Sequence, residues 1–150
     1  MKIERLYTRR IMAARRSSPI AEAAATMQRF GVGSLLVMED GPGPKPVGIV
    51  TDRDLAIQGF ASESSQVGSV MTPIVATVRE EADVHEALEI MRAHGVRRLL
   101  VTSGDGALRG ILSIDDVVDG LSADLAAAAA VLKGEVKRDA AGLGDVITGG

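Results

Sequence analysis

Two short stretches of the sequence each place a side-chain hydroxyl three residues before a carboxylate. Thr51 precedes Asp54 in one stretch and Ser113 precedes Asp116 in the other, and each hydroxyl follows a glycine and two apolar residues. A hydroxyl at a strand end and a carboxylate in the next helical turn share one rim, beside helix N–H groups without intrahelical partners. Such a rim can accept hydrogen bonds from ribose hydroxyls and donate hydrogen bonds to a phosphate.

A purely structural role explains either stretch when it is considered alone. Thr51 and Ser113 are typical helix N-caps, and Asp54 and Asp116 would then interact with the helix dipole. Each such interaction contributes about 0.5–2 kcal/mol or less. Any capping residue would serve that purpose, so the recurrence of the same pattern in both stretches favours contact with a ligand.

Other kinds of chemistry have little support. The chain has no cysteine and only two histidines, His85 and His94, so thiol chemistry is excluded and a histidine-rich metal centre is not expected. Residues 41–46 lack the Lys-Ser/Thr pair of a phosphate-binding loop and are interpreted as a hairpin turn. No pair of nucleophile and base stands out, so an enzyme is not expected.

Composition also limits the partners and the compartment. The net charge of −3 and the aromatic content of 2% give no electrostatic or stacking basis for binding nucleic acid. No segment approaches the roughly 20 apolar residues of a membrane-spanning helix, and the N-terminus lacks the apolar core of a secretory signal. We therefore expect a cytoplasmic protein without nucleic-acid or membrane partners.

The chain contains an internal repeat with an offset of 64 residues. Residues 21–37 align without a gap with residues 85–101, and ten pairs in the repeat are identical, among them Gly31 with Gly95 and Leu35 with Leu99. The offset then changes within a Gly/Pro-rich turn, which is where a surface loop tolerates insertions. The repeat predicts two structurally equivalent units.

The second copy gives the clearer set of predicted elements. Residues 74–78 predict a strand, and Asp83 is the expected N-cap of the next helix, with Glu86 three residues later. Apolar residues recur along this helix with the spacing of one buried face. Gly95 is expected to end it in the left-handed conformation.

The first copy repeats this order more weakly. Residues 10–14 predict the strand, and Ser17 or Ser18 is expected to cap a helix whose first residue is Pro19. Gly31 is expected to end that helix in the same way as its counterpart in the second copy.

After each of these helices, two apolar runs predict a pair of adjacent strands. They comprise residues 34–38 and 47–50 in the first copy and residues 98–102 and 108–112 in the second. A second helix is expected next in each copy, and it opens at Asp52 in the first copy and at Asp115 in the second. Because one such unit buries little surface alone, the two copies are expected to pack sheet against sheet around a pseudo-twofold axis.

This organisation predicts four segments. The first copy comprises residues 1–60, a linker follows at 61–69, and the second copy comprises residues 70–122. Residues 123–150 are expected to form a C-terminal helix and a flexible tail, because the periodicity is lost from residue 134 onward.

The order of motifs resembles the tandem CBS-domain, or Bateman, module. A capped helix, Gly-Val, a Leu-Leu-Val strand, a turn, and Gly followed by two apolar residues and Thr/Ser-x-x-Asp occur twice, across about residues 6–120. The resemblance implies an α/β fold of two β-α-β-β-α repeats packed with pseudo-twofold symmetry. It also implies a disc with two equivalent clefts that commonly take adenine nucleotides or adenosyl compounds, and discs that often pair into homodimers.

The resemblance assigns residues of this chain to both clefts. The first would combine Thr51, Arg53, Asp54, Thr72, Ala76, Arg97 and Arg98. The second would combine Thr8, Gly33, Ser34, Ser113, Asp115 and Asp116.

The two clefts are expected to differ in charge. Arg97 and Arg98 match the place from which basic residues of the family reach phosphate, and guanidinium groups bind phosphate bidentately. The second cleft has Gly33 and Ser34 at that place and an extra carboxylate at Asp115, so we expect the first cleft to be the nucleotide site. Because neighbouring strand residues point to opposite faces, only one of the two arginines is expected to enter it. The alternative is that both lie on a solvated strand edge.

The sequence thus predicts a regulatory, ligand-sensing module. Candidate ligands are AMP, ADP, ATP, NAD and S-adenosylmethionine, with Mg²⁺ beside a phosphate left open. A homodimer and an unidentified downstream protein are the expected partners. The alternative is a dimerisation or interaction scaffold that has the same fold and binds no ligand.

Overall fold

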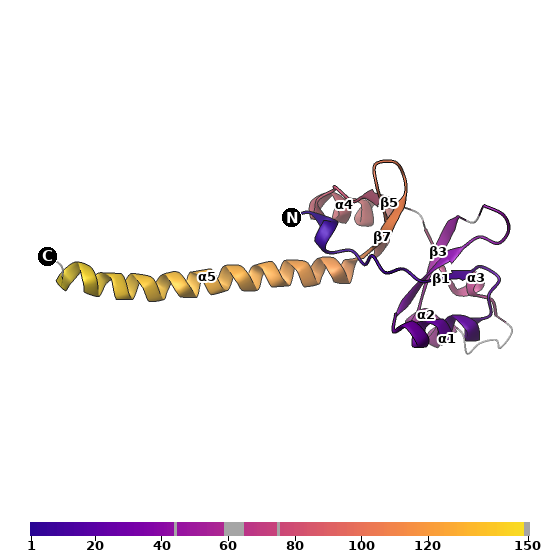
Figure 1. The fold of residues 1–150 in the computed structure, drawn as a ribbon, viewed down its shortest axis with the longest axis horizontal. Coiled ribbons are helices and arrows are strands. Elements are labelled where there is room, and N and C mark those ends of the chain that lie inside the picture. Colours follow the sequence, from indigo (N-terminus) through magenta and orange to yellow (C-terminus); the bar gives the residue numbers. More distant parts are fainter. Residues whose placement is uncertain (44, 59–64, 75, 149–150) are drawn as a thin grey trace. The chain divides into compact units, whose positions relative to one another are not determined.

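The computed structural model describes residues 1–43, 45–58, 65–74 and 76–148 (Figure 1). The chain divides into two compact units, the first comprising Met1–Ser113 and the second beginning at Ile114. Of the predicted linker at 61–69, residues 61–64 lie outside the described residues. Within the described part of the chain, all strands belong to the first unit.

The first unit contains both repeats. A short 3₁₀ helix, η1 (Ile3–Arg5), comes before the first. The first repeat comprises β1 (Ala13–Arg15), α1 (Ile20–Phe30), β2 (Ser34–Met38), β3 (Pro46–Thr51) and α2 (Asp52–Gln58). The second comprises α3 (Val67–Val70), β4 (Thr72–Pro73), β5 (Thr77–Arg79), α4 (Val84–His94), β6 (Arg98–Thr102) and β7 (Leu108–Ser113).

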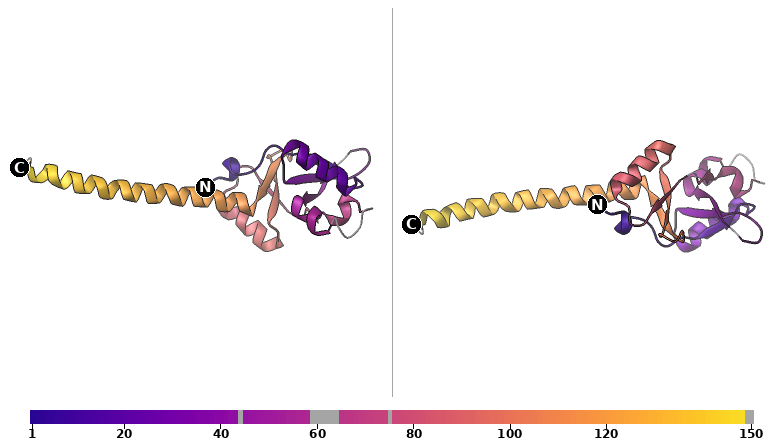
Figure 2. Two further views of the ribbon diagram at one scale, coloured as in Figure 1. Left: turned by 90° about the horizontal axis from the view of Figure 1, so that it is seen from below. Right: turned by 90° about the horizontal axis from the view of Figure 1, so that it is seen from above.

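The strands form two sheets with equivalent pairing. One sheet has the order β1-β2-β3-β4 and the other β5-β6-β7. In each sheet the first strand runs parallel to the second, and the second runs antiparallel to the third. Helices α1 and α2 lie side by side on one face of the first sheet (Figures 1 and 2). The predicted α/β fold with two equivalent repeats is confirmed.

The two sheets meet through aliphatic side chains. Leu36 and Ile49 of the first sheet form one buried cluster with Leu100 and Ile111 of the second. Leu36 pairs with Ile49 across its sheet, as Leu100 pairs with Ile111 across the other, so the cluster follows the pseudo-twofold relation. This confirms the predicted packing of sheet against sheet.

Local signals predict the helix ends of the second repeat and the C-terminal end of α1. Asp83 is the N-cap of α4, and its carboxylate accepts a hydrogen bond of 2.9 Å from the backbone N–H of Glu86. This hydrogen bond is the main cause that lowers the pKa of Asp83 below its ordinary value. Gly31 and Gly95 end α1 and α4 with φ of 63° and 64°, in the left-handed region that glycine adopts without strain.

The predicted start of α1 is wrong by one residue. Pro19 is the N-cap rather than the first helical residue, because its backbone is extended, with ψ of 146°. Neither serine caps the helix. The Ser18 hydroxyl instead accepts a hydrogen bond from the backbone N–H of Arg15, and the Ser17 hydroxyl bonds to Asp40.

The predicted strand at 74–78 is also different in the structure. Thr72 and Pro73 pair with β3 of the first sheet, whereas Thr77–Arg79 pairs with β6 of the second. Val75 lies outside the described residues, and of the described residues in the predicted range, Thr77 and Val78 belong to a strand. In the first repeat the strand is shifted to Ala13–Arg15, where its backbone pairs with β2.

The entry segment of each repeat, which contains η1 in the first and α3 and β4 in the second, packs onto the other repeat. Backbone hydrogen bonds join Ile3 N–H to Ala82 O at 3.1 Å and Thr8 N–H to Ile111 O at 2.9 Å. In the equivalent crossing, Thr72 pairs with Ile49. Ile3 and its counterpart Val67 are both wholly buried. The two repeats are therefore interlocked by a reciprocal exchange of their entry segments.

Helix α5 (Ile114–Thr148) forms the second unit (Figure 1). It continues past Gly134, from which point the sequence loses its periodicity and a frayed helix and flexible tail are expected. The segment that follows contains no proline, the residue that most disfavours a helix interior. Among the described residues, no helix combines the length and apolarity needed to span a membrane.

Candidate functional site

The first candidate site is a hollow of about 200 Å³ where β3, β4 and the start of β6 come together; we call it the Thr51 cleft. It is lined by Ile49, Thr51, Thr72, Pro73, Ile74, Gly95, Val96, Arg97, Arg98 and Leu100. The wall joins apolar side chains from both sheets to two hydroxyls and two arginines. Largely apolar walls with a few polar groups are typical of small-molecule sites.

A second hollow of about 220 Å³, the Ser113 cleft, is its counterpart. It is lined by Thr8, Arg10, Ile11, Gly33, Ser34, Arg98, Ile111 and Ser113. Apart from Ile11 and Arg98, each of these residues occupies the repeat position of a residue that lines the Thr51 cleft. The two clefts are similar in size and differ in the side chains that line them.

Thr51 and Asp54 bind each other through a capping box. The backbone N–H of Asp54 donates to Thr51 Oγ1 at 3.1 Å, and the backbone N–H of Thr51 donates to Asp54 Oδ2 at 2.9 Å. The first turn of α2 is therefore stabilised reciprocally, as the structural interpretation of this motif predicts. Thr51 also lines the cleft, so this residue both caps α2 and forms part of the candidate site.

The family model for the CBS domain matches this chain twice, over residues 3–58 and 67–123. The chain belongs to the CBS-domain family. The resemblance seen in the sequence is confirmed, and the two repeats are two CBS repeats.

Known proteins with similar sequence or structure agree with this assignment. An uncharacterized protein of Methanopyrus kandleri is 34% identical over 101 residues, which cover 65% of this chain and 50% of that protein. The chain thus spans about half the length of this curated relative.

Two solved structures share the fold. The CBS domain protein from Pyrobaculum aerophilum complexed with AMP has a TM-score of 0.61 and 27% identity, over 77% of this chain and 89% of that one. The CBS domain pair of protein MJ0100, in complex with 5-methylthioadenosine and S-adenosyl-L-methionine, has a TM-score of 0.66 and 22% identity, over 83% and 98%. At that identity the second match supports the fold alone.

The structure brings together part of the residue set predicted for the first CBS cleft. Thr72, Arg97 and Arg98 line the Thr51 cleft with Thr51 itself. Both arginines contribute to the wall, where the strand alternation predicts only one. Arg97 comes immediately before β6, in the connection that follows α4, so it does not follow the alternation of the strand.

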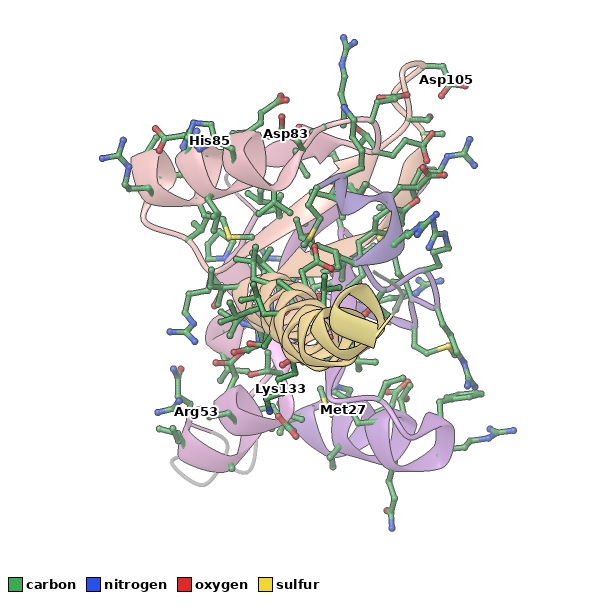
Figure 3. The ribbon with its side chains drawn as sticks, turned by 90° about the vertical axis from the view of Figure 1, so that its left-hand side faces the viewer. Met27, Arg53, Asp83, His85, Asp105 and Lys133 are labelled. Atoms are coloured by element: carbon green, nitrogen blue, oxygen red, sulfur yellow. The ribbon has the colours of Figure 1, made fainter. Side chains whose placement is uncertain are left out.

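Three predicted residues do not line this cleft. Arg53 is exposed on α2 and points into solvent (Figure 3). Asp54 is half-buried and its carboxylate is bound in the capping box with Thr51, and Ala76 is half-buried in the segment between β4 and β5. The apolar side chains of Ile49 and Leu100, which the sequence does not single out, line the cleft instead. Both residues occupy aligned apolar positions of the two repeats, so the repeat alignment could have identified them.

The Ser113 cleft also differs from the prediction. Thr8, Gly33, Ser34 and Ser113 line it as expected, but Arg10 and Arg98 do so too. Among the described residues, two arginines therefore line each CBS cleft. The resemblance assigns Arg98 to the first cleft alone, and Arg10 lies before the aligned motif. Asp115 and Asp116 belong to α5 and thus to the second unit.

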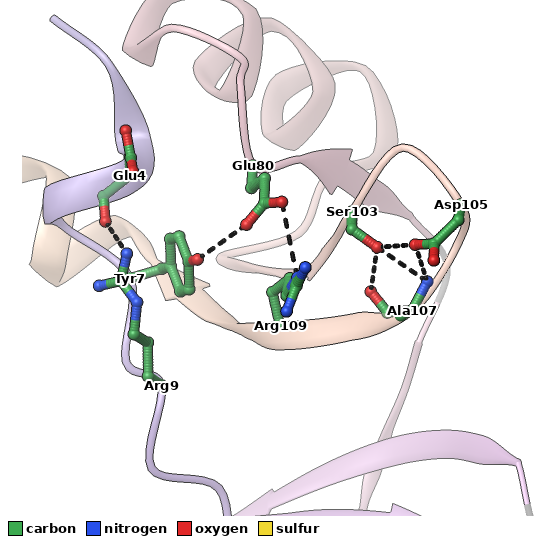
Figure 4. Close-up of polar contacts among 8 residues, drawn as sticks. All are labelled: Glu4, Tyr7, Arg9, Glu80, Ser103, Asp105, Ala107 and Arg109. Carbon is green, nitrogen blue, oxygen red and sulfur yellow. Dashed lines mark hydrogen bonds and ion pairs between the residues drawn. The ribbon is translucent and has the colours of Figure 1, made fainter.

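A polar cluster holds the N-terminal segment beside the second CBS repeat (Figure 4). The Tyr7 hydroxyl lies 3.3 Å from Glu80 Oε2, and Arg109 Nε lies 3.5 Å from Glu80 Oε1. The Arg9 guanidinium lies over the Tyr7 ring at 4.3 Å from its centre. The cluster fixes the chain immediately before and after Thr8, which lines the Ser113 cleft.

No group of three or more His, Cys, Asp or Glu side chains able to hold a metal ion occurs among the described residues. The donors that line the clefts are hydroxyls and guanidinium groups. Guanidinium groups carry positive charge and no acceptor, so they suit anionic oxygen atoms and not metal ions.

Proposed function

We propose that this chain is a regulatory module that binds an adenine nucleotide or a related adenosyl compound between its two CBS repeats. Binding, without conversion of the ligand, is the proposed activity. The observation that carries the proposal is the Thr51 cleft, where aliphatic walls lie next to hydroxyls and arginines.

Each part of such a ligand has side chains in the lining that suit it chemically. Ile49, Ile74 and Leu100 form an apolar wall against which a flat purine ring can pack. Thr51 and Thr72 supply hydroxyls for the sugar, while Arg97 and Arg98 supply guanidinium groups for a phosphate. The AMP complex of the Pyrobaculum aerophilum protein, which shares the fold, supports the same ligand class.

The direct test is a thermal-shift and calorimetric panel of AMP, ADP, ATP, NAD and S-adenosylmethionine, with and without Mg²⁺. A ligand at 100 times its dissociation constant stabilises the folded chain by about 2.7 kcal/mol. We expect at least one member to raise the unfolding temperature in proportion to the logarithm of its concentration. If no ligand of the panel changed the unfolding temperature, the proposal would be overturned.

A charge-removing variant tests the role of the arginines. Arg97→Met removes the guanidinium and keeps a long stem, so AMP binding should weaken by about 1.5–3 kcal/mol, the usual value of a charged hydrogen bond. Adenosine, which has no phosphate, should bind the variant and the parent chain alike. Arg29→Met, on the exposed face of α1, makes the same charge change away from both clefts and should bind AMP normally.

A second candidate function, self-association, is favoured by one specific feature of α5. The side chains of Val118, Leu121, Leu125 and Leu132 are between 44% and 73% exposed. With Ala128 they follow the alternating spacing of three and four residues that is typical of coiled-coil seams. We propose that a second copy of this chain covers this seam.

Charge favours an antiparallel arrangement of the two α5 helices. Asp119 and Asp124 lie before Ala128 and Lys133 lies after it, so antiparallel pairing around Ala128 brings Asp124 of one copy near Lys133 of the other. We expect the chain to sediment as a dimer and Leu125→Glu to sediment as a monomer. Ala123→Glu, on the opposite side of the helix, should remain dimeric. A monomeric parent chain, or a dimer that survives Leu125→Glu, would overturn this arrangement.

A further inference from the structure

One residue belongs to both clefts. Arg98, the first residue of β6, lines the Thr51 cleft and the Ser113 cleft. Its repeat counterpart, Ser34, lines the Ser113 cleft alone. The pseudo-twofold relation of the two repeats is broken at this position, because a long cationic side chain replaces a short hydroxyl.

Within the described part of the chain, the side chain of Arg98 makes no hydrogen bond or ion pair, and the residue is half-buried. Each cleft also has one arginine that the other lacks, Arg97 in the Thr51 cleft and Arg10 in the Ser113 cleft. Among the described residues, the two clefts therefore hold three arginines, whereas a separate pair for each cleft would need four.

We propose that Arg98 couples the two clefts, so that a phosphate-bearing ligand in one cleft weakens the binding of a second such ligand in the other. The inference rests on the proposed function, since it concerns the regulation of the same ligand sites. It predicts negative coupling for nucleotides and none for nucleosides.

The coupling follows from the geometry of one shared donor. A guanidinium group binds one phosphate bidentately with its planar fork and cannot present that fork to two phosphates in separate clefts. The first phosphate to bind takes Arg98, and the second ligand finds a single arginine. By linkage, each ligand weakens the other by the same factor. We expect a factor of about 10, within the usual range for coupled sites.

Direct repulsion between two bound phosphates would also weaken the second binding step. The two causes differ in how they respond to Arg98→Met. Loss of the shared guanidinium removes the competition, so the coupling should disappear. Repulsion alone would persist or grow, because a positive charge between the phosphates would be lost.

The experiment is a site-resolved titration of the full chain with AMP, followed by the methyl signals of selectively labelled isoleucines. Ile74 lines only the Thr51 cleft and Ile11 lines only the Ser113 cleft, so each reports the occupancy of its own site. Negative coupling makes each curve broader than a single-site isotherm. We expect this broadening with AMP and simple isotherms with adenosine.

Two variants complete the test. Arg98→Met should bind AMP in both clefts with coupling reduced to less than about twofold, whereas Arg29→Met should keep the coupling of the parent chain. If AMP fills one cleft in the parent chain and both in Arg98→Met, the inference is also supported. It is overturned if the coupling survives Arg98→Met, if adenosine shows the same coupling, or if AMP fills a single cleft in both proteins. If neither AMP nor adenosine shifts either methyl signal, the proposed function itself fails.

Discussion

Gly110 of β7 lies so close to Tyr7 that a Cβ atom at Gly110 would overlap the Tyr7 ring and the backbone oxygen of Thr8. Gly48 has the same relation to Met71, and its added Cβ would lie 3.0 Å from the backbone oxygen of Thr72. Neither glycine has a positive φ. The glycine that opens each Gly-x-x-Thr/Ser motif is therefore required by the close approach of the entry segment from the other repeat.

Gly110→Ala should destabilise the fold. The added methyl group would have to displace the Tyr7 ring and the backbone at Thr8, and overpacking of this kind costs about 1–3 kcal/mol. Urea unfolding should show a lower midpoint with an unchanged slope. Gly104→Ala is the matched control, because that glycine has no atom within 4 Å of an added Cβ and no positive φ. Equal loss of stability in both variants would contradict the close-packing explanation.

Ile3→Ala should be severely destabilising although it lies near the N-terminus. Ile3 is wholly buried and its backbone is hydrogen-bonded to Ala82 of the second repeat. Truncation of a buried isoleucine to alanine costs about 2–5 kcal/mol, which calorimetry or denaturant unfolding would detect.

The matched control for Ile3→Ala is Ile57→Ala. It removes the same atoms from a side chain that is 65% exposed, and it should change the free energy of unfolding by less than about 0.5 kcal/mol. If the two variants were equally stable, the entry segment would not be part of the core.

Local signals in the sequence were sufficient for some features and insufficient for others. The left-handed ends at Gly31 and Gly95 and the cap at Asp83 depend on residues within one or two turns, so spacing alone predicts them. The packing of Ile3 onto the second repeat depends on partners about 80 positions away, and the segment is too short to show a periodicity.

The candidate site, too, could be predicted from the sequence only in part. The hydroxyls of Thr51 and Thr72 could be assigned because they recur at equivalent positions in the two repeats. Arg10 lies before the aligned motif, and the place of Arg98 in two clefts depends on how the two sheets face each other. An alignment of the two repeats shows which positions are equivalent. It does not show which side chains reach across the pseudo-twofold axis between the repeats.

Thr51→Val should lower stability and leave the shape of the cleft nearly unchanged. Valine has a similar volume but cannot accept the hydrogen bond from the backbone N–H of Asp54, so half of the capping box is lost. Loss of an N-cap costs about 0.5–2 kcal/mol, which would be measured by denaturant unfolding without ligand. Thr51→Ser keeps the hydroxyl and should retain most of the stability. Equal losses in both variants would show that the methyl group, and not the cap, matters.

Asp83→Asn should change how stability depends on pH. The hydrogen bond from Glu86 N–H lowers the pKa of Asp83 in the folded chain, with Lys2 adding a smaller contribution in the same direction. A carboxyl group whose pKa is lower in the folded state stabilises it fully above its ordinary pKa, and this stabilisation is lost as the pH falls through the folded value. Asparagine caps helices nearly as well and does not titrate.

The difference in free energy of unfolding between the parent chain and Asp83→Asn should therefore be constant at neutral pH. It should shift against the parent chain as the pH falls below the ordinary pKa of an aspartate, about 3.9, because the unfolded chain then takes up the proton before the folded chain does. Denaturant unfolding at a series of pH values measures this difference directly. Asp83→Ser is the matched variant, because serine also caps without titrating and should give the same pH profile as asparagine. A difference that stays constant down to the acid limit of folding would mean that the Asp83 carboxylate contributes nothing beyond a neutral cap.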